Sequence, residues 1–155
     1  MDYIKNINGY NVIVDDEGME LLNKYSWKVR KFGNKLYLRA SIRMNGKKKD
    51  ASFHRLIANT PNGLHTDHIN GNSLDNRKCN LRVVTAAINN QNLVKAKRDN
   101  KCGLLGANWH KRVKKWRAQI RLNKKTIHIG YFDTAIEAHN AYLQRKREIH
   151  SGCTI

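Results

Sequence analysis

Residues 64–93 read LHTDHINGNSLDNRKCNLRVVTAAINNQNL, and this stretch decides how the centre of the chain folds. Asn and Gly residues are typical of a tight turn between two strands. A Thr directly before a run of helix-forming residues is a good N-cap, as Thr85 is here. The stretch therefore predicts a ββα unit. Its predicted elements are, in order, a strand at His65–Ile69, a turn at Asn70–Asn72, a loop at Ser73–Cys79, a strand at Asn80–Val84 and a helix that begins at Ala86.

The chemistry of this unit lies in Asp67, His68 and Asn89. A phosphodiester resists hydrolysis because water is a weak nucleophile and the alkoxide is a poor leaving group. An imidazole can take a proton from the water, and a hard cation can neutralise charge on the leaving oxygen. Mg²⁺ prefers oxygen ligands and keeps several waters, which suits one carboxylate and one amide oxygen. Taken singly, each residue is more often a surface acid, a packed histidine or a capping asparagine.

Asp67 and His68 are adjacent, so in a regular strand their side chains would point to opposite faces. Both can serve one phosphate only where the strand ends or bends. Asn70-Gly71, directly downstream, permits such a bend. We therefore expect the strand to end or bend at this point.

Taken together, the string resembles the HNH endonuclease superfamily, in its phage homing-endonuclease branch. The resemblance implies that His68 is the general base, that Asp67 and Asn89 hold Mg²⁺, Mn²⁺ or another divalent cation, and that Asn80 orients the His68 ring. Zinc-binding cysteine pairs, common around this unit in the family, are absent, so no structural zinc is expected and the flanking parts must support the fold. The matching segments are Asp67–Asn72, Leu74–Arg77, Asn80–Arg82, and Thr85 with Asn89.

The segment Phe53–Ile57 also matches this branch upstream of the site. His54 either packs under the ββα unit or faces the scissile phosphate, and packing is the favoured interpretation. Arg55 and Asn76 are further candidate neighbours of the site.

The parts before and after the ββα unit resemble each other. Residues 39–48, RASIRMNGKK, align without a gap with residues 117–126, RAQIRLNKKT, and both alternate polar and apolar residues around an Asn-containing turn. This pattern is typical of a β-hairpin. It predicts three strands followed by a helix in each part, through duplication or through convergent hairpin chemistry. A further short helix is predicted from Asp15 or Asp16 to Tyr25.

The last part has the alternation of a sheet that reads DNA. Arg117, Gln119 and Arg121 share one face of a strand, while Ala118 and Ile120 point toward the following helix. In a major groove Arg can pair with guanine and Gln with adenine, while Lys contacts phosphate. A solvated polar sheet face is the ordinary alternative. Twelve basic residues and one acid lie between Lys95 and Lys125: Lys95, Lys97, Arg98, Lys101, Lys111, Arg112, Lys114, Lys115, Arg117, Arg121, Lys124 and Lys125, with Asp99.

From Gly103 onward the chain resembles the ethylene-response-factor (Apetala-type) DNA-binding domain. The resemblance implies a three-stranded antiparallel sheet on one helix, with the sheet in the major groove. Lys111 and its neighbours are more basic than in many family members, and Gln119 alters the base readout. The implied DNA-facing residues are Trp109, Lys111, Arg112, Trp116, Arg117, Gln119 and Arg121, and by analogy Arg39 and Arg43 in the first part. The matching residues are Gly106, Trp109, Trp116–Ile120, Gly130–Thr134, Glu137, Ala138, Ala141 and Tyr142.

Composition points to the same partner. The 155 residues carry 30 Lys and Arg against 12 Asp and Glu, a net charge of +18, and five of the acids lie within the first twenty residues. Such a surface favours an anionic polymer that releases counterions. We expect double-stranded DNA as partner and no membrane, because the sequence shows no basic amphipathic helix, apolar span or signal peptide. The three scattered cysteines give neither a disulfide framework nor a zinc site.

These patterns predict an α+β protein of four parts: an N-terminal sheet-and-helix region at 1–60, a nuclease unit at 61–95, a linker at 96–102 and a DNA-binding domain at 103–155. The favoured function is a metal-dependent HNH DNA endonuclease of homing type, encoded by a phage or bacterium and acting in the host cytoplasm or nucleoid. A monomer is expected, with a dimer as the alternative. A DNA-binding regulator with an idle nuclease unit and an RNA-binding protein are the competing functions.

Overall fold

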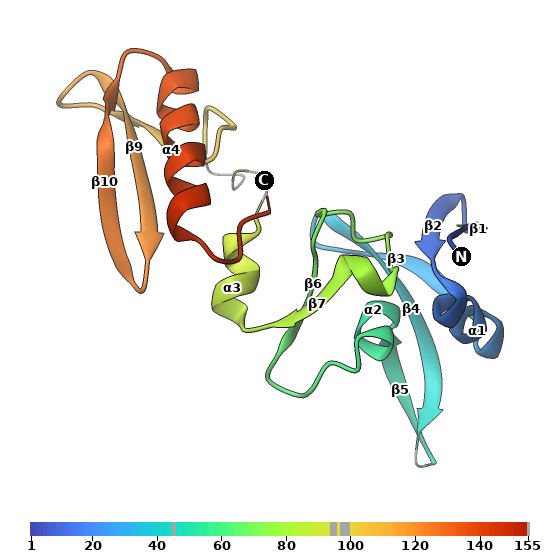
Figure 1. Cartoon of the computed structure of the whole chain (residues 1–155). Coiled ribbons are helices and arrows are strands. Elements are labelled where there is room, and N and C mark those ends of the chain that lie inside the picture. Colours follow the sequence, from blue (N-terminus) through green and yellow to red (C-terminus); the bar gives the residue numbers. More distant parts are fainter. Residues whose placement is uncertain (45, 94–95, 97–99, 155) are drawn as a thin grey trace. The chain divides into compact units, whose positions relative to one another are not determined.

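The computed structural model describes the chain apart from residues 45, 94–95, 97–99 and 155, and it divides into two compact units (Figure 1). These units are Met1–Asn89 and Asn90–Ile155. The strands of the described sheets pair antiparallel and alternate with helices, so the predicted α+β class is confirmed. The predicted turn residue Asn45 and the basic linker residues Lys95, Lys97 and Arg98, with Asp99, lie outside the described residues.

The first unit contains two small sheets before the ββα unit. Its elements are β1 (Tyr3–Ile7), β2 (Tyr10–Val14), α1 (Asp16–Lys24), β3 (Lys28–Phe32), β4 (Lys35–Met44), β5 (Lys47–Ser52), α2 (Phe53–Ile57), β6 (His65–His68), a 3-10 turn (Lys78–Asn80), β7 (Leu81–Val84) and most of α3 (Ala86–Gln91), which spans the boundary between the units.

The predicted helix after Asp15 is confirmed, because the Asp15 side chain accepts a hydrogen bond from the Gly18 N–H at 3.1 Å and so caps α1. The β1–β2 hairpin was not predicted. Its signal was present in the sequence, since Asn8-Gly9 is a typical hairpin turn between alternating residues. The three strands followed by a helix are confirmed as β3–β4–β5 and α2.

The core of this unit lies against one face of β4. Leu38, Ala40 and Ile42 are buried on that face, together with Val12 and Val14 of β2. The Trp27 and Phe53 rings meet edge to face, with centroids 4.8 Å apart, and extend the core toward α2. Because side chains alternate along a strand, the other face of β4 carries the polar residues.

The N-terminal part supports the ββα unit through specific bonds. Ile13 donates its backbone N–H to Leu74, and Asn76 donates its own to Ile13. The Lys78 N–H donates to the Asp15 carboxylate at 2.7 Å. Leu74 and Leu81 pack on the core described above. Support from a flanking part, expected because zinc-binding cysteine pairs are absent, therefore comes from β2 and the start of α1.

The second unit is a three-stranded antiparallel sheet packed on one long helix, as predicted. Ala107, Ala118 and Ala138 form its buried centre. Gly106 lies against the Tyr142 ring, where a Cβ atom would stand 2.0 Å from the ring, and its φ of +74° favours glycine. Thr134 and Glu137 form a capping box that starts the helix. The elements are β8 (Ala107–His110), β9 (Lys115–Leu122), β10 (Lys125–Phe132) and α4 (Ala135–Ile149).

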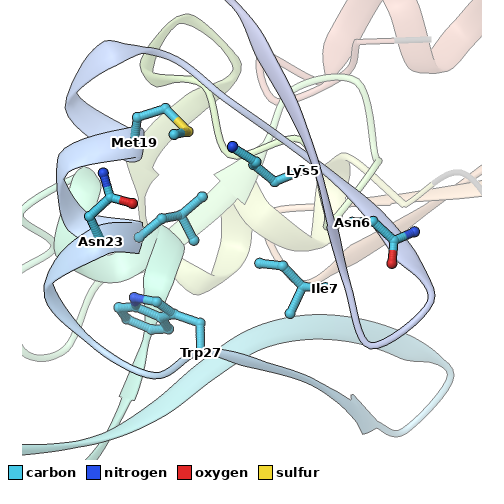
Figure 2. A pocket seen from close by; sticks show the side chains of 7 residues that line it. Lys5, Asn6, Ile7, Met19, Asn23 and Trp27 are labelled. Atoms are coloured by element: carbon cyan, nitrogen blue, oxygen red, sulfur yellow. The ribbon is translucent and has the colours of Figure 1, made fainter.

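Among the described residues, no helix is long and apolar enough to cross a membrane. A pocket of about 260 Å³ opens between β1 and α1 and is drawn in Figure 2. Its wall includes Lys5, Ile7, Met19 and Trp27, and it contains none of the residues predicted for the catalytic site.

Candidate active site

The site is built on the β6–β7 hairpin, where Asp67 pairs with Arg82 and His68 with Leu81. β6 ends at His68, and the chain turns at once, because the Gly71 N–H donates to the His68 carbonyl. Gly71 has a φ of +74°, which glycine adopts without strain. Asp67 and His68 are both buried. The expected end of the strand at this point is therefore confirmed.

Asn80 holds the loop that follows. Its side-chain oxygen accepts the Asn70 N–H at 3.0 Å, and its amide donates to the Asn70 side chain at 3.1 Å and to the Asp75 carbonyl at 2.8 Å. Its own backbone carbonyl accepts the Ile69 N–H. The structure thus gives Asn80 a definite part in fixing the residues directly after His68. Its contact with the His68 ring itself stays a prediction.

The amide beside the His68 ring belongs to Asn76. Asn76 Oδ1 lies 3.4 Å from His68 Nε2, at the long end of hydrogen-bond range. Asn76 is fully buried, and its own amide donates to the Leu74 carbonyl at 3.2 Å. With a hydrogen on Nε2, this contact leaves the imidazole lone pair on Nδ1. Asn76, named from the sequence only as a neighbour, is therefore a direct partner of the ring.

Three aromatic rings from three elements meet at the site. The His54 ring of α2 lies 5.2 Å from the His68 ring and 5.3 Å from the Tyr37 ring, and Tyr37 lies 6.4 Å from His68. His54 is buried and packs beside the His68 ring, which is the favoured packing interpretation, and its facing the scissile phosphate stays untested. Tyr37 was missed, although its alternation with Arg39 and Arg43 placed it on their strand face.

Burial sets the protonation of this cluster. It lowers the pKa of His54 to about 3, with help from the charge of His68 when that ring is protonated and from the positive charges of Arg55 and Arg39. It also lowers the pKa of His68 below its ordinary 6.5, against the opposing effect of the Asn76 hydrogen bond. The pKa of Tyr37 is raised, first by burial and then by the negative charge of Asp67. His68 is therefore in its basic form at neutral pH.

Asp67 is paired across the hairpin with Arg82. Arg82 Nε and one terminal nitrogen both donate to the same Asp67 oxygen, at 3.0 and 2.8 Å. The Arg82 guanidinium thus shares this carboxylate with any cation bound there. Asn89, the other expected metal ligand, is the fourth residue of α3 and is partly exposed, and its backbone N–H donates to the Thr85 carbonyl.

Arg55 acts on the backbone near the site. Its guanidinium donates to the carbonyls of Leu64 at 2.8 Å, Pro61 at 3.1 Å and Thr60 at 3.3 Å. These three carbonyls belong to the loop that leads into β6. Arg55 thereby supports the entry into β6.

The open face of β4 continues from the site as a basic surface. The strand register puts Arg39 opposite Lys28 and Ser52, and Arg43 opposite Lys48. Arg39 also pairs with Asp50 at 2.6 Å. We call this surface the β4 basic face. Its members, all on the side of the sheet that carries Tyr37, are Lys28, Arg30, Lys35, Arg39, Arg43 and Lys48.

The second unit also has a basic sheet face. The strand register of β9 and β10 shows which of the residues expected to read DNA lie on it. Arg117, Gln119 and Arg121 share the outer face of β9 with His128 and Tyr131 of β10. Lys111 and Arg112 lie exposed in the turn between β8 and β9.

The two tryptophans correct the expectation of one sheet face carrying Arg, Gln and Trp. Trp109 and Trp116 pair with each other on the face of Ala118, which packs against α4. Trp116 is partly buried there, whereas Trp109 is 50% exposed at the edge strand. Adjacent residues of a strand alternate, so Trp116 and Arg117 cannot share a face.

Residues 52–91 match the family model of the HNH endonuclease. This range runs from the residue before α2 to the last residue of α3 and so contains His54, Asp67, His68, Asn80 and Asn89. Protein 3.8 of Escherichia phage T7 is 31% identical to the chain over 90 residues, which are 58% of this chain and 73% of that protein. No solved structure matches the chain significantly.

Proposed function

Because this chain belongs to the family of Protein 3.8 of Escherichia phage T7 and carries an HNH endonuclease domain, we propose that it hydrolyses phosphodiester bonds of double-stranded DNA with a divalent metal. The observation that carries this proposal is the geometry at the end of β6. There a buried histidine in its basic form stands beside a buried carboxylate. Such a pair supplies a proton acceptor and a hard metal ligand at one point.

His68 is the general base of the proposed reaction. With Nε2 directed to Asn76, Nδ1 of the ring takes a proton from the attacking water. Asn76 holds the ring orientation, and Tyr37 and His54 cover the ring on other sides. The turn at Gly71 and the hydrogen bonds of Asn80 direct the loop after His68 away from the direction of β6.

Asp67 and Asn89 would hold the metal. Their carboxylate and amide oxygens are hard donors that fit Mg²⁺ or Mn²⁺. Among the described residues no three His, Cys, Asp or Glu side chains gather as a metal cluster, so water and phosphate oxygens would complete the coordination. When bound, the cation would supply charge neutralisation at the leaving oxygen.

DNA would be gripped by two basic surfaces. In the second unit, Arg117, Gln119 and Arg121 form the face that would enter a major groove, in the manner of ethylene-response-factor domains. Lys111, Arg112 and the exposed edge of Trp109 flank it, whereas Trp116 contributes through packing. In the first unit the β4 basic face, with Arg39 and Arg43, would hold phosphates next to His68. The proposed role is homing in a phage-infected cell. The proposed acting form is a monomer.

One assay tests the nuclease. The full chain is incubated with supercoiled plasmid in Mg²⁺, in Mn²⁺ and in EDTA, beside a His68→Ala variant. We expect metal-dependent nicked or linear product from the wild type, and a loss of at least about a hundredfold in the variant. Gel-shift affinity for the plasmid in EDTA should be equal for both proteins. Equal cutting by the two proteins, or none by either, would reject the proposal.

A second function is favoured by one observation, the ion pair between Arg82 and Asp67. If Arg82 keeps the carboxylate from a cation, the chain would bind DNA as a regulator without cutting. The same assay separates the two, because the regulator would shift the plasmid on the gel and leave it supercoiled. The ratio of nicked to linear product then reports whether an active enzyme attacks one strand or both.

A further inference from the structure

The tip of the β3–β4 hairpin carries an exposed aromatic ring. Phe32 is the last residue of β3 and is 73% exposed, and Gly33 and Asn34 turn the chain into Lys35. Packing does not account for this ring, since Phe32 is not among the residues that pack on the core of the unit. An exposed phenyl group at a hairpin tip is available for a partner.

The ring points to the side of the sheet that carries the candidate active site. Phe32 pairs with Lys35, and Arg30 with Tyr37, so all four side chains lie on the β4 basic face. The Phe32–Lys35 pair is one two-residue step, about 7 Å, from the Tyr37 position. Tyr37 in turn lies 6.4 Å from the His68 ring. Phe32 is therefore within reach of DNA bound at His68.

The surroundings of the ring select the partner. No acidic residue occurs between Glu20 and Asp50, while Lys28, Arg30, Lys31 and Lys35 surround Phe32 in the sequence. An apolar protein partner would have to bury these charges unpaired, which is costly. Duplex DNA offers phosphates to the lysines and a base stack to the ring, and apolar wedges in nucleic-acid-binding proteins use this combination.

We propose that Phe32 inserts into the base stack of the DNA substrate, within about four base pairs of the bond cut at His68, while Lys35 contacts the flanking phosphate. The distance follows from the two steps above and the rise of about 3.4 Å per base pair. This inference rests on the proposed nuclease function and adds to it a residue that distorts the substrate. Partial unstacking there would open the strand toward the buried His68.

The test uses the full chain and a base-stacking probe. The nick is first mapped on plasmid DNA. Duplexes are then prepared with 2-aminopurine at each position up to five base pairs from the nick. They are mixed with the His68→Ala variant, which should bind the DNA without cutting it. We expect a rise of about twofold or more in 2-aminopurine fluorescence at one position, because unstacking relieves quenching. The double variant with Phe32→Ala should lose this rise, and the one with Phe32→Trp should keep it.

Cutting gives a second readout and a matched control. In the wild-type background, Phe32→Ala should slow nicking about tenfold or more, in line with the loss of one base–aromatic contact. Ile4→Ala is the control, because Ile4 is 69% exposed on the β1–β2 hairpin of the same unit. It should cut as wild type does. Circular dichroism should show both variants folded, since neither side chain is in the core.

Three outcomes would overturn the inference. If wild-type protein nicks DNA but no position gives a fluorescence rise that depends on Phe32, the wedge is wrong and the nuclease proposal stands. If the wild type cuts nothing, both fail together. If Phe32→Ala lowers the mass of the free protein in sedimentation while the fluorescence rise persists, Phe32 contacts a second copy instead of DNA.

Discussion

At the scale of single residues, the protonation of the site depends on the burial of two histidines, His54 and His68. The rings of His54 and His68 lie close to the Tyr37 ring, and burial lowers the pKa of both histidines. A buried imidazole without charge can accept a proton at neutral pH, whereas an exposed one near pH 6.5 is already partly protonated. Packing around His68 thereby contributes to its chemistry as well as to stability.

His54 gives a prediction for stability against pH. Its pKa is about 3 in the folded chain and about 6.5 when unfolded, so between these values the unfolded state binds more protons. Its stabilising contribution is therefore complete above pH 6.5 and is lost as the pH falls toward 3. The free energy of unfolding should fall by up to about 1.4 kcal/mol per pH unit from this group. Urea unfolding at pH 7, 5 and 4 measures this slope.

His54→Gln should show a shallower slope, because glutamine has no proton to gain. His65→Gln is the matched control, since His65 is an exposed histidine of β6. It should keep the wild-type slope. Equal slopes for wild type and His54→Gln would contradict the burial of a neutral His54 ring.

At the scale of elements, the loop between β6 and β7 is fixed by asparagines that serve different purposes. Asn80 is buried and ties Asn70 to Asp75, while Asn76 touches the His68 ring. Asp75 adds a buried ion pair with Arg77 at 2.7 Å, and the Arg77 hydrogen bonds lower the pKa of that carboxyl group. A loop fastened in this way holds Asp67 and His68, the proposed metal ligand and the proposed base, in one arrangement.

Asn80 is buried, whereas Asn89 is partly exposed. The same substitution to alanine should therefore have different effects on stability at these two positions. Asn80→Ala leaves the Asn70 N–H and the Asp75 carbonyl without a partner and should lower the free energy of unfolding by about 1–3 kcal/mol. Asn89→Ala removes a partly exposed side chain and should change stability by less than about 0.5 kcal/mol. Urea unfolding and plasmid nicking are measured on both.

Asn89→Ala should nonetheless abolish metal-dependent nicking if Asn89 holds the cation. A variant that is stable and still nicks at the wild-type rate would remove Asn89 from the metal site. An Asn80→Ala protein as stable as wild type would show that the loop does not need this clamp.

At the scale of the whole molecule, the proposed cutting site and the proposed groove-reading face of β9 lie in different compact units. His68, Asp67 and the β4 basic face lie in Met1–Asn89, whereas Arg117 and Arg121 lie in Asn90–Ile155. The predicted nuclease unit is therefore integrated with the N-terminal part, through the bonds of Ile13 and Asp15. Affinity and rate should respond to substitutions in different units.

Arg121→Ala tests this division. Removing one phosphate or base contact should weaken DNA binding and reduce the slope of log K against log salt by about one. The nicking rate at saturating protein should not change, because Arg121 is far in sequence from the catalytic unit. Arg145→Ala is the charge-matched control: Arg145 lies on α4 and pairs with Glu148. An equal salt slope for both variants would show that the outer face of β9 does not contact DNA.

The sequence by itself determined the local order of elements and the HNH-like string at residues 64–93. Alternation, Asn-containing turns and N-caps act over a few residues, so β6, β7, α3, the strands of the two three-stranded sheets and the start of α1 followed from them. The β1–β2 hairpin, which was not predicted, has an equally local signal at Asn8-Gly9. The HNH string likewise depends on spacing within one segment.

Only the tertiary structure decided which distant side chains complete the site. Tyr37 and Lys35 come from β4, His54 comes from α2 and Asn76 from the loop after β6, and packing brings them to His68. It also decided that Trp116 packs inward, and that His68 has a lowered pKa. The burial of a side chain depends on contacts with many segments of the chain. A local sequence pattern therefore does not predict it.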